Sequence, residues 1–240
     1  MDALRRNPSR HQAVLPTQPP WCDIDDDSRQ ILLEGAQQIV ADRGAYIDAD
    51  VVVIRRGVIA LERELSDGRR ILVSIFHDGD LVDFRQSERA RQCRIISTAP
   101  SDLIVFDEGW MDICLTSCPT ITAVVDRQLR RQQARSNDHI ADLAAKTPLE
   151  RLASVLFEFG RWPEGDVGEK GQPIIRVPIR RTDIADYLGM TPETLSRAVR
   201  CFEREDLIRT LDNDQILMVD VISLRRIANG GRPRRSTRTV

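Results

Sequence analysis

Residues 180–204 read RRTDIADYLGMTPETLSRAVRCFER, and two short helices fit this stretch. The first helix is expected over about Thr182–Leu188. Gly189 follows where the chain must turn sharply, because glycine adopts a positive φ without steric cost. Thr191 can cap a second helix, and Pro192 suits its first position. This pattern of helix, glycine turn and capped helix predicts a helix-turn-helix.

The second helix of this motif has an apolar and a polar face. The apolar face holds Leu195, Val199 and Phe202, and the polar face holds Glu193, Ser196, Arg197, Arg200 and Arg204. Arginine can bind N7 and O6 of guanine, glutamate can accept a hydrogen bond from N4 of cytosine, and serine adapts to either partner. The polar face therefore predicts readout of base edges in double-stranded DNA. The alternative is that Glu193 and Arg197, four residues apart, form only a surface ion pair.

A hairpin and a last helix are expected after the helix-turn-helix. Leu207–Thr210 and Gln215–Val219 flank Asp212-Asn213-Asp214, which resembles a wing with an acidic tip. Such a tip should not press closely on phosphate. Asp220 is expected to cap a helix over Val221–Ala228.

The charge of the chain is unevenly distributed. The 35 basic and 37 acidic residues leave a net charge of only −2 over 240 residues. Residues 170–240, however, contain 14 basic and 9 acidic residues, a net of +5, so residues 1–169 carry −7. This asymmetry indicates that the C-terminal third meets a polyanion. The final residues hold four arginines and no acid, which suits either weak phosphate contacts or a solvated tail without function.

The N-terminal half differs from the C-terminal third in its pattern of apolar and turn-forming residues. Residues 1–22 contain four prolines and few large apolar residues, and are expected to form a disordered tail. The acids Asp25–Asp27 suit the first turn of a helix, which we expect to run to about Asp42. Ala45–Phe106 consists of short apolar runs separated by Gly/Asp turns, which favours a small barrel or sandwich.

A long helix is expected over about Pro119–Ala145. Its apolar stripe is interrupted around Gln132 and is too incomplete for a fully buried helix. Such a stripe is typical of half a seam that a second chain completes, and the alternative is a helix lying on its own barrel. Thr147-Pro148-Leu149-Glu150 then forms a capping box that starts another helix.

Together these residues resemble the Crp/Fnr superfamily of bacterial transcription regulators over about Ile31–Ala228. The motif Thr191–Arg197, followed by Phe202-Glu203-Arg204-Glu205, is similar to the FNR/FixK branch. The resemblance implies that Glu193, Ser196 and Arg197 read a TTGA-type half-site and that the long helix forms a homodimer. It also implies phosphate contacts, which we assign to Arg180, Arg181, Thr191 and Arg200.

The implied fold class is α+β, with an N-terminal cyclic-nucleotide-binding-like β-barrel (jelly roll), a long dimerisation helix and a C-terminal winged helix-turn-helix. The expected divisions are a disordered tail (1–22), a degenerate sensor domain (23–118), the dimerisation helix (119–146), the DNA-binding domain (147–229) and a basic tail (230–240).

The sensor half departs from the pattern of cyclic-nucleotide binders in the superfamily. Those proteins carry Gly-Glu and Arg-Ser pairs after a Gly-Asp turn, with amides that hold the phosphate. Here Gly79–Phe84 is followed by RQSERARQCR, which contains no Gly-Glu, and Arg91 is followed by Gln92. We therefore expect no cyclic-nucleotide binding.

Five irregularly spaced cysteines do not form a disulfide framework, which indicates a reducing cytoplasm. They do not match the iron–sulfur cluster ligands of FNR, and Cys114-x3-Cys118 is expected to be a pair of packed thiols, so we expect no metal and no cofactor. Cys201 lies near Arg197, Arg200 and Arg204, which would favour a reactive thiolate. It is a candidate redox switch, or else a half-buried residue of the helix packing.

The residues also argue against two other classes, a membrane-spanning protein and an enzyme. No stretch approaches the 18 apolar residues of a membrane-spanning helix. The three histidines stand beside no serine or cysteine nucleophile in a recognisable frame, so no enzyme is expected. The leading hypothesis is a homodimeric, sequence-specific regulator that acts with RNA polymerase on oxygen-limited respiration, nitrogen-oxide or nitrogen-fixation genes. The alternative is a cysteine-based redox or metal sensor with DNA binding as its output.

Overall fold

The computed structural model describes residues 4–6, 13–85, 92–160, 167–168, 171–212 and 214–231. The chain divides into two compact units, residues 1–137 and 138–240, and the division falls inside helix α3 (Pro119–Ala145). Most of the expected basic tail, from residue 232 onward, lies outside the described residues, as does the segment 86–91 in the sensor half.

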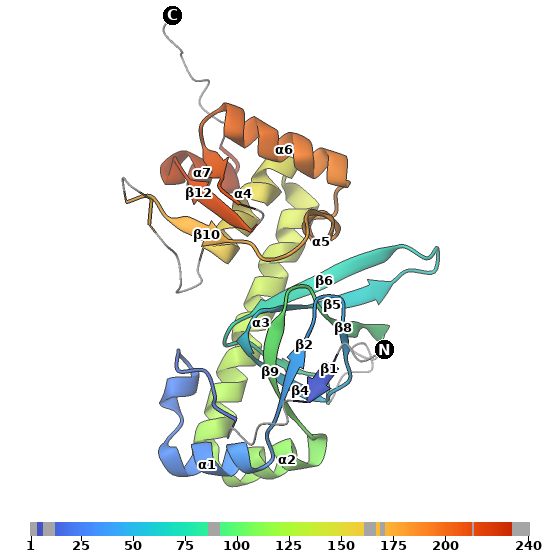
Figure 1. Ribbon diagram of the computed structural model, residues 1–240, viewed down its shortest axis with the longest axis vertical. Coiled ribbons are helices and arrows are strands. Elements are labelled where there is room, and N and C mark those ends of the chain that lie inside the picture. The colour runs from blue at the N-terminus through green and yellow to red at the C-terminus, as the bar shows by residue number, and fades with distance from the viewer. Residues whose placement is uncertain are drawn as a thin grey trace, which may run out of the picture. The chain divides into compact units, whose positions relative to one another are not determined.

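The N-terminal unit contains two antiparallel sheets (Figure 1). The first has the order β1-β2-β9-β4-β7, formed by Leu4–Arg6, Gln37–Ala41, Ser101–Phe106, Val51–Arg56 and Leu81–Asp83. The second has the order β3-β8-β5-β6, formed by Tyr46–Ile47, Arg94–Ser97, Val58–Glu64 and Arg70–His77. Within the described residues no strand pair joins the two sheets, so the expected jelly roll is a sandwich and not a closed barrel.

Strand β4 contributes to two hydrophobic cores, because both of its faces are buried. Val52 and Ile54 face the space between the sheets. That core also contains Ile39, Ile47, Ile59, Phe76, Ile95 and Leu103. Val51 and Val53 face the opposite way, into a second core with the helices of the unit. Burial on both faces explains why this strand is continuously apolar and does not alternate.

The expectation of a disordered tail over residues 1–22 is wrong for residues 13–22. Ala13, Leu15 and Trp21 are buried in the second core, and a short 3-10 helix (η1) spans Trp21–Asp23. The Trp21 indole Nε1 donates a hydrogen bond to the carbonyl of Gly79, 2.6 Å away. The proline-rich composition obscured a segment in which three apolar side chains are buried, although Val14 remains exposed.

The first helix is also shorter than expected. Helix α1 spans Asp26–Glu34 and is capped by Asp25, as its acidic start indicated. It stops at Gly35, and residues 37–41 form strand β2, paired with β9 from Gln37↔Val105 to Ala41↔Ser101. A β-carbon at Gly35 would lie 2.2 Å from the Trp110 ring, so the chain passes this indole too closely for any other residue.

Helices α2 (Glu108–Ser117) and α3 cover the outer face of the first sheet. Ile121, Val124 and Val125 of α3 are buried against it. The first part of α3 therefore lies on its own sandwich, as the alternative interpretation held. Leu129 and Ile140 nevertheless remain 40% and 61% exposed, and they continue the apolar stripe toward the end of the helix.

The C-terminal unit combines helices with a three-stranded sheet. Its helices are α4 (Pro148–Phe159), α5 (Arg181–Tyr187), α6 (Pro192–Arg204) and α7 (Val221–Ala228). The sheet has the order β10-β12-β11, formed by Ile174–Arg176, Gln215–Met218 and Ile208–Thr210. The capping box at Thr147 and the Asp220 cap are present as expected. Strand β10 was not expected, because the glycine-rich stretch before it carries no clear signal for the start of a strand.

Candidate nucleic-acid interface

The turn between α5 and α6 has the geometry that the sequence predicted. Gly189 has a φ of +60°, in the left-handed region that glycine tolerates. The amide of Met190 donates to the carbonyl of Ala185 at 3.0 Å, which closes the turn. Arg151 Nη1 donates to the carbonyl of Leu188 at 2.9 Å. A side chain of α4 thus fixes the turn from outside.

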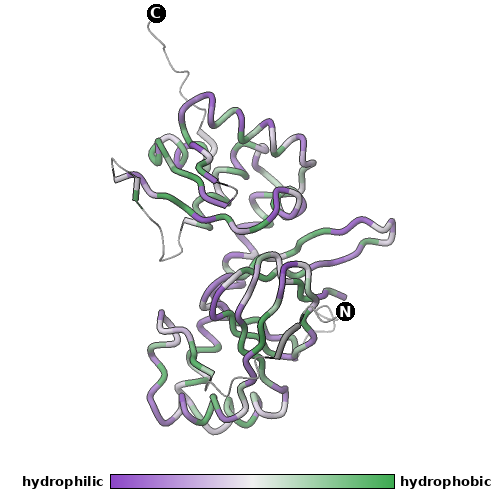
Figure 2. Tube along the Cα trace, viewed as in Figure 1, coloured by the Kyte–Doolittle hydropathy of each residue, from purple (hydrophilic) through white to green (hydrophobic). Residues whose placement is uncertain are grey.

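Helix α6 begins with the capping residues that the sequence predicted. The hydroxyl of Thr191 accepts a hydrogen bond from the amide of Thr194 at 3.2 Å, and Pro192 occupies the first turn. Leu195, Ala198 and Phe202 are buried against the rest of the unit. In Figure 2 the trace of α6 changes repeatedly between hydrophilic and hydrophobic colours, as an amphipathic helix does.

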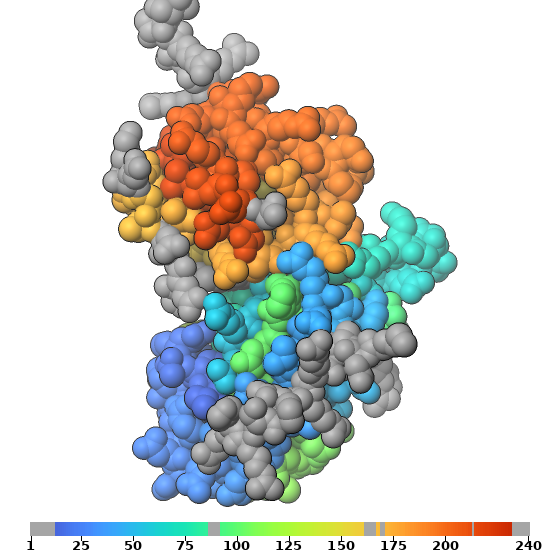
Figure 3. Space-filling view, viewed as in Figure 1, coloured from blue at the N-terminus to red at the C-terminus, as the bar shows by residue number. Residues whose placement is uncertain are grey.

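The opposite face of α6 is open to solvent, and its orange atoms lie on the surface in Figure 3. Glu193, Arg197 and Arg200 are exposed and Ser196 is partly exposed. Glu193 and Arg197 form no ion pair within the described residues, so the interpretation as a simple surface ion pair lacks support. The structure thus brings the three expected base-contact residues onto one accessible helix face.

Glu193 is held in its ionised form. The backbone amide at the helix start lowers the pKa of its carboxyl most, followed by the Thr191 hydroxyl and the charge of Arg197. An ionised carboxylate only accepts hydrogen bonds. It therefore suits an exocyclic amine such as N4 of cytosine.

The residues expected at phosphates lie at the beginnings of the two helices. Arg180 precedes α5 as its N-cap residue, and Arg181 is its first residue. Both are exposed, as are Thr191 and Arg200 on α6. Helix N-termini and exposed guanidinium groups are common phosphate ligands. The structure places all four side chains on the surface of the unit that contains α6.

The end of α3 is attached to α5 by an aromatic stack, which sequence reasoning missed. The rings of His139 and Tyr187 are parallel within 4°, with centroids 3.9 Å apart. Arg151 Nη2 also donates to the carbonyl of Leu143 at 2.7 Å. No local pattern reveals this pairing, because the two rings lie far apart in sequence.

In the N-terminal unit, the turn after β6 is bound to α3 and to the N-terminal segment. Trp21 and Gln128 both donate to the carbonyl of Gly79, and Gln132 donates to that of Leu81. Arg135 Nη2 lies 2.7 Å from Asp80 Oδ1. Gln132, which interrupts the apolar stripe of α3, is therefore a contact to the sandwich.

The cysteines fall into different environments. Cys114 and Cys118 are buried in the second core, and burial raises the pKa of the Cys114 thiol, with smaller contributions from Cys118 and Glu34. Cys201 is partly exposed, and Arg204 Nη2 lies 3.7 Å from its sulfur. Among the described residues no group of three or more His, Cys, Asp or Glu side chains is arranged to hold a metal ion. The same described residues contain no helix that is both long and apolar enough to span a bilayer.

A helix-turn-helix next to a small antiparallel sheet defines a winged-helix DNA-binding unit, here joined to a jelly-roll sandwich by a long helix. Residues 150–227 match the Crp-like helix-turn-helix domain. This match, together with the relatives and the solved structure described next, supports a Crp/Fnr-type transcription regulator similar to the FNR/FixK branch.

Individual relatives agree with this assignment. The nitrogen fixation regulation protein FixK of Azorhizobium caulinodans is 26% identical over 185 residues, which cover 74% of this chain and 71% of FixK. The transcriptional activator protein FnrL of Cereibacter sphaeroides is 24% identical over 223 residues, or 90% of this chain and 88% of FnrL. The structure of FixK2 from Bradyrhizobium japonicum shares the fold, with a TM-score of 0.68 at 21% identity over 82% of this chain and 98% of FixK2.

Proposed function

We propose that this chain is a homodimeric transcriptional activator that reads a TTGA-type palindrome with α6. The observation that carries the proposal is the polar face of α6, where Glu193, Ser196 and Arg197 are accessible together while the opposite face is buried. Arg180, Arg181, Thr191 and Arg200 would contact phosphates and hold α6 in register. This role places the protein in the cytoplasm, with RNA polymerase as a partner at promoters.

The proposed dimer would use the exposed part of the α3 stripe. Leu129 and Ile140 stand on a helix whose other side packs on its own unit. Joining two such helices would cover these side chains and present two copies of α6 to the two halves of a palindrome. The name of the relative FixK supports targets in nitrogen fixation. Genes of oxygen-limited respiration or nitrogen-oxide metabolism are proposed as targets from the resemblance to the FNR/FixK branch alone.

We also propose that the sensor half, about residues 23–118, binds no cyclic nucleotide. The space between its sheets is filled by aliphatic side chains and Phe76. The carboxylate of Asp80, in the Gly-Asp turn, already binds Arg135. Calorimetry with cyclic AMP and cyclic GMP should therefore show no heat of binding, and micromolar affinity for either would contradict this part of the proposal.

The main proposal is tested by measuring which DNA half-site the protein prefers. Fluorescence anisotropy would compare duplexes with a TTGA palindrome, a GTGA palindrome, one TTGA half-site and a scrambled sequence. We expect the TTGA palindrome to bind most tightly, with two chains per duplex, and the single half-site to bind much more weakly. Equal affinity for the TTGA and scrambled duplexes would refute sequence-specific binding, and one chain per palindrome would refute the dimer.

A further inference from the structure

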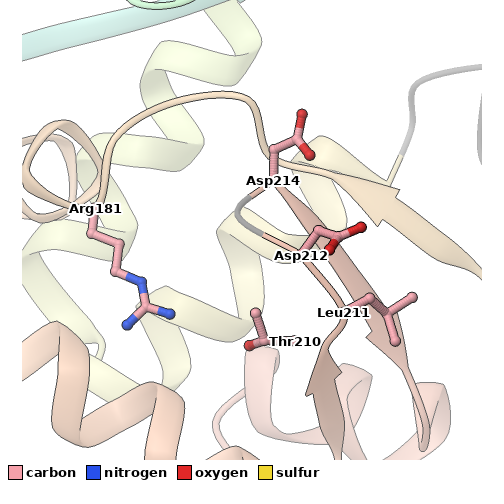
Figure 4. Close-up of a pocket in the computed structure, with 5 residues that line it drawn as sticks. All are labelled: Arg181, Thr210, Leu211, Asp212 and Asp214. Carbon is pink, nitrogen blue, oxygen red and sulfur yellow. The ribbon is translucent and has the colours of Figure 1, made fainter.

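A hollow of about 640 Å³ lies between the start of α5 and the wing, the hairpin formed by β11 and β12 (Figure 4). Its lining residues are Arg181, Thr210, Leu211, Asp212 and Asp214. Arg181 comes from the first turn of α5 and the other four from the wing. In Figure 4 the Arg181 side chain extends into the space between the two elements, and the aspartates stand on the wing across from it.

The charges around this hollow are not paired across it. Asp214 Oδ2 binds Arg176 Nε at 2.9 Å, on the strand next to the wing. Neither Arg181 nor Asp212 forms an ion pair with any residue in the part of the chain that the structure describes. Asp212 is exposed on the wing, and its charge contributes to the field on that side of the hollow. One wall of the hollow therefore attracts an anion and the other repels it.

The hollow is attached to α6. The hydroxyl of Thr210, at the end of β11, donates to Glu203 Oε1 on α6 at 2.7 Å. When α6 enters a major groove, the wing must approach the backbone beside that groove. Because Arg181 shares the hollow with the wing, a phosphate bound by Arg181 would lie opposite Asp212.

We propose that Asp212 limits the affinity of this protein for the DNA backbone by repelling the phosphate that Arg181 binds. The inference rests on the proposed DNA binding through α6, and it assigns the wing a repulsive role there. Backbone attraction is the same for every sequence, whereas the contacts of Glu193, Ser196 and Arg197 are not. Weakening backbone attraction lowers the time spent on non-cognate DNA, and the bases contribute a larger part of the remaining affinity.

The size of the effect follows from screening. Two unit charges several ångströms apart near a protein surface interact modestly in water, and salt screens them over about 8 Å at physiological ionic strength. Removing the Asp212 charge should thus raise affinity about twofold to fivefold per wing at low salt. The increase should apply to cognate and scrambled duplexes alike and should shrink as salt is added.

The test is Asp212→Asn in the full chain, with binding to both duplexes measured at about 50 and 200 mM salt. Asp138→Asn is the matched control, since it removes one exposed carboxylate from α3 and changes the net charge equally. Equal melting temperatures of the three proteins would show that folding is unaffected. We expect tighter binding from Asp212→Asn alone; unchanged or weaker binding, or an equal increase from Asp138→Asn, would overturn the proposal.

A second comparison tests whether Asp212 acts on the phosphate that Arg181 binds. In an Arg181→Ala background that phosphate is no longer held opposite Asp212, so Asp212→Asn should strengthen binding to scrambled DNA less than it does in the wild type. An undiminished effect would show that Asp212 acts independently of the Arg181 phosphate and would contradict the proposal. A wild-type chain that shows no preference for the palindrome would instead refute the proposed function, whatever the wing variant does.

Discussion

Arg135 Nη2 on α3 lies 2.7 Å from Oδ1 of Asp80, a carboxylate that is only 5% exposed. The same guanidinium approaches Nε2 of His77 at 2.9 Å. The turn after β6 is thereby bound to the long helix by a charge pair with little access to water. Such a pair is expensive to break from one side, because the partner left behind remains buried and charged.

Arg135→Met should therefore destabilise the N-terminal unit by about 2–3 kcal/mol, which is less than the roughly 3–5 kcal/mol for breaking a fully buried pair, because Arg135 is partly exposed. Urea unfolding followed by tryptophan fluorescence measures the change. Arg130→Met is the control, because Arg130 binds Asp126 on the exposed side of the same helix. Equal stability of the two variants would show that Asp80 is solvated without Arg135.

Substitutions on α6 should separate base readout from backbone contacts. Glu193→Ala and Arg197→Ala should each weaken binding to the TTGA palindrome about tenfold to a hundredfold and leave binding to scrambled DNA nearly unchanged. Arg200→Ala should weaken binding to both duplexes and reduce the salt dependence. Competition assays distinguish the two patterns. A uniform loss for Arg197→Ala would reassign this residue to the backbone.

Acidification should weaken the C-terminal unit through His139. Burial lowers the pKa of this imidazole from its ordinary value of 6.5, with Arg151 acting in the same direction and Asp142 opposing it. Because the unfolded chain binds the proton more readily, the stability contribution is complete above pH 6.5 and declines as the pH falls. His139→Phe keeps an aromatic ring against Tyr187 but cannot titrate.

Denaturant unfolding of the wild type and His139→Phe at pH 7.5 and pH 5.5 (about one unit on either side of the ordinary histidine pKa) tests this. We expect the stability difference between the two proteins to shift in favour of the variant at the lower pH. A difference independent of pH would mean that the imidazole is as easily protonated in the folded state as in the unfolded state.

Gly189 should resist substitution for two reasons. Any other residue is strained at a φ of +60°, and a β-carbon would lie 3.3 Å from Leu143 Cδ2. Gly189→Ala should cost about 1–2 kcal/mol and lower DNA affinity by disturbing the angle between α5 and α6. Gly189→Asn, which tolerates the left-handed region better, should be less destabilising. Thermal unfolding ranks the variants, and no difference between alanine and asparagine would exclude strain as the cause.

The thiol of Cys201 remains a candidate redox switch. Peroxide would convert the thiol to a sulfenic acid and water, placing a polar group beside Arg204 at the end of α6. We expect peroxide to weaken DNA binding of the wild type reversibly and to leave Cys201→Ser unaffected. Wild-type binding that is insensitive to peroxide would leave Cys201 with a packing role only.

Local signals predicted the DNA-binding unit well. Thr191, Pro192, Gly189 and the capping box at Thr147 specify their structures through hydrogen bonds and backbone angles within a few residues. The polar and apolar sides of α6 also follow directly from helical periodicity. For this reason the candidate site could be assembled from sequence before any tertiary contact was known.

Long-range partners explain what could not be predicted. In sequence, residues 37–41 resemble the end of a helix. They form strand β2 instead, because strand β9 pairs with them through backbone hydrogen bonds. Trp21 lies in a proline-rich segment, and the partners that bury it, including the carbonyl of Gly79, are distant in sequence. The stack of His139 on Tyr187 and the open hollow beside Asp212 likewise depend on chain segments that meet only after folding.

Strand β4 has one consequence for how the N-terminal unit unfolds. Val51 and Val53 belong to the core beneath the helices, while Val52 and Ile54 belong to the core between the sheets. Detaching either layer exposes half of this strand to water and removes support from the other layer. The sandwich and its helical cover should therefore melt in one cooperative transition, without a stable intermediate that retains only one of them.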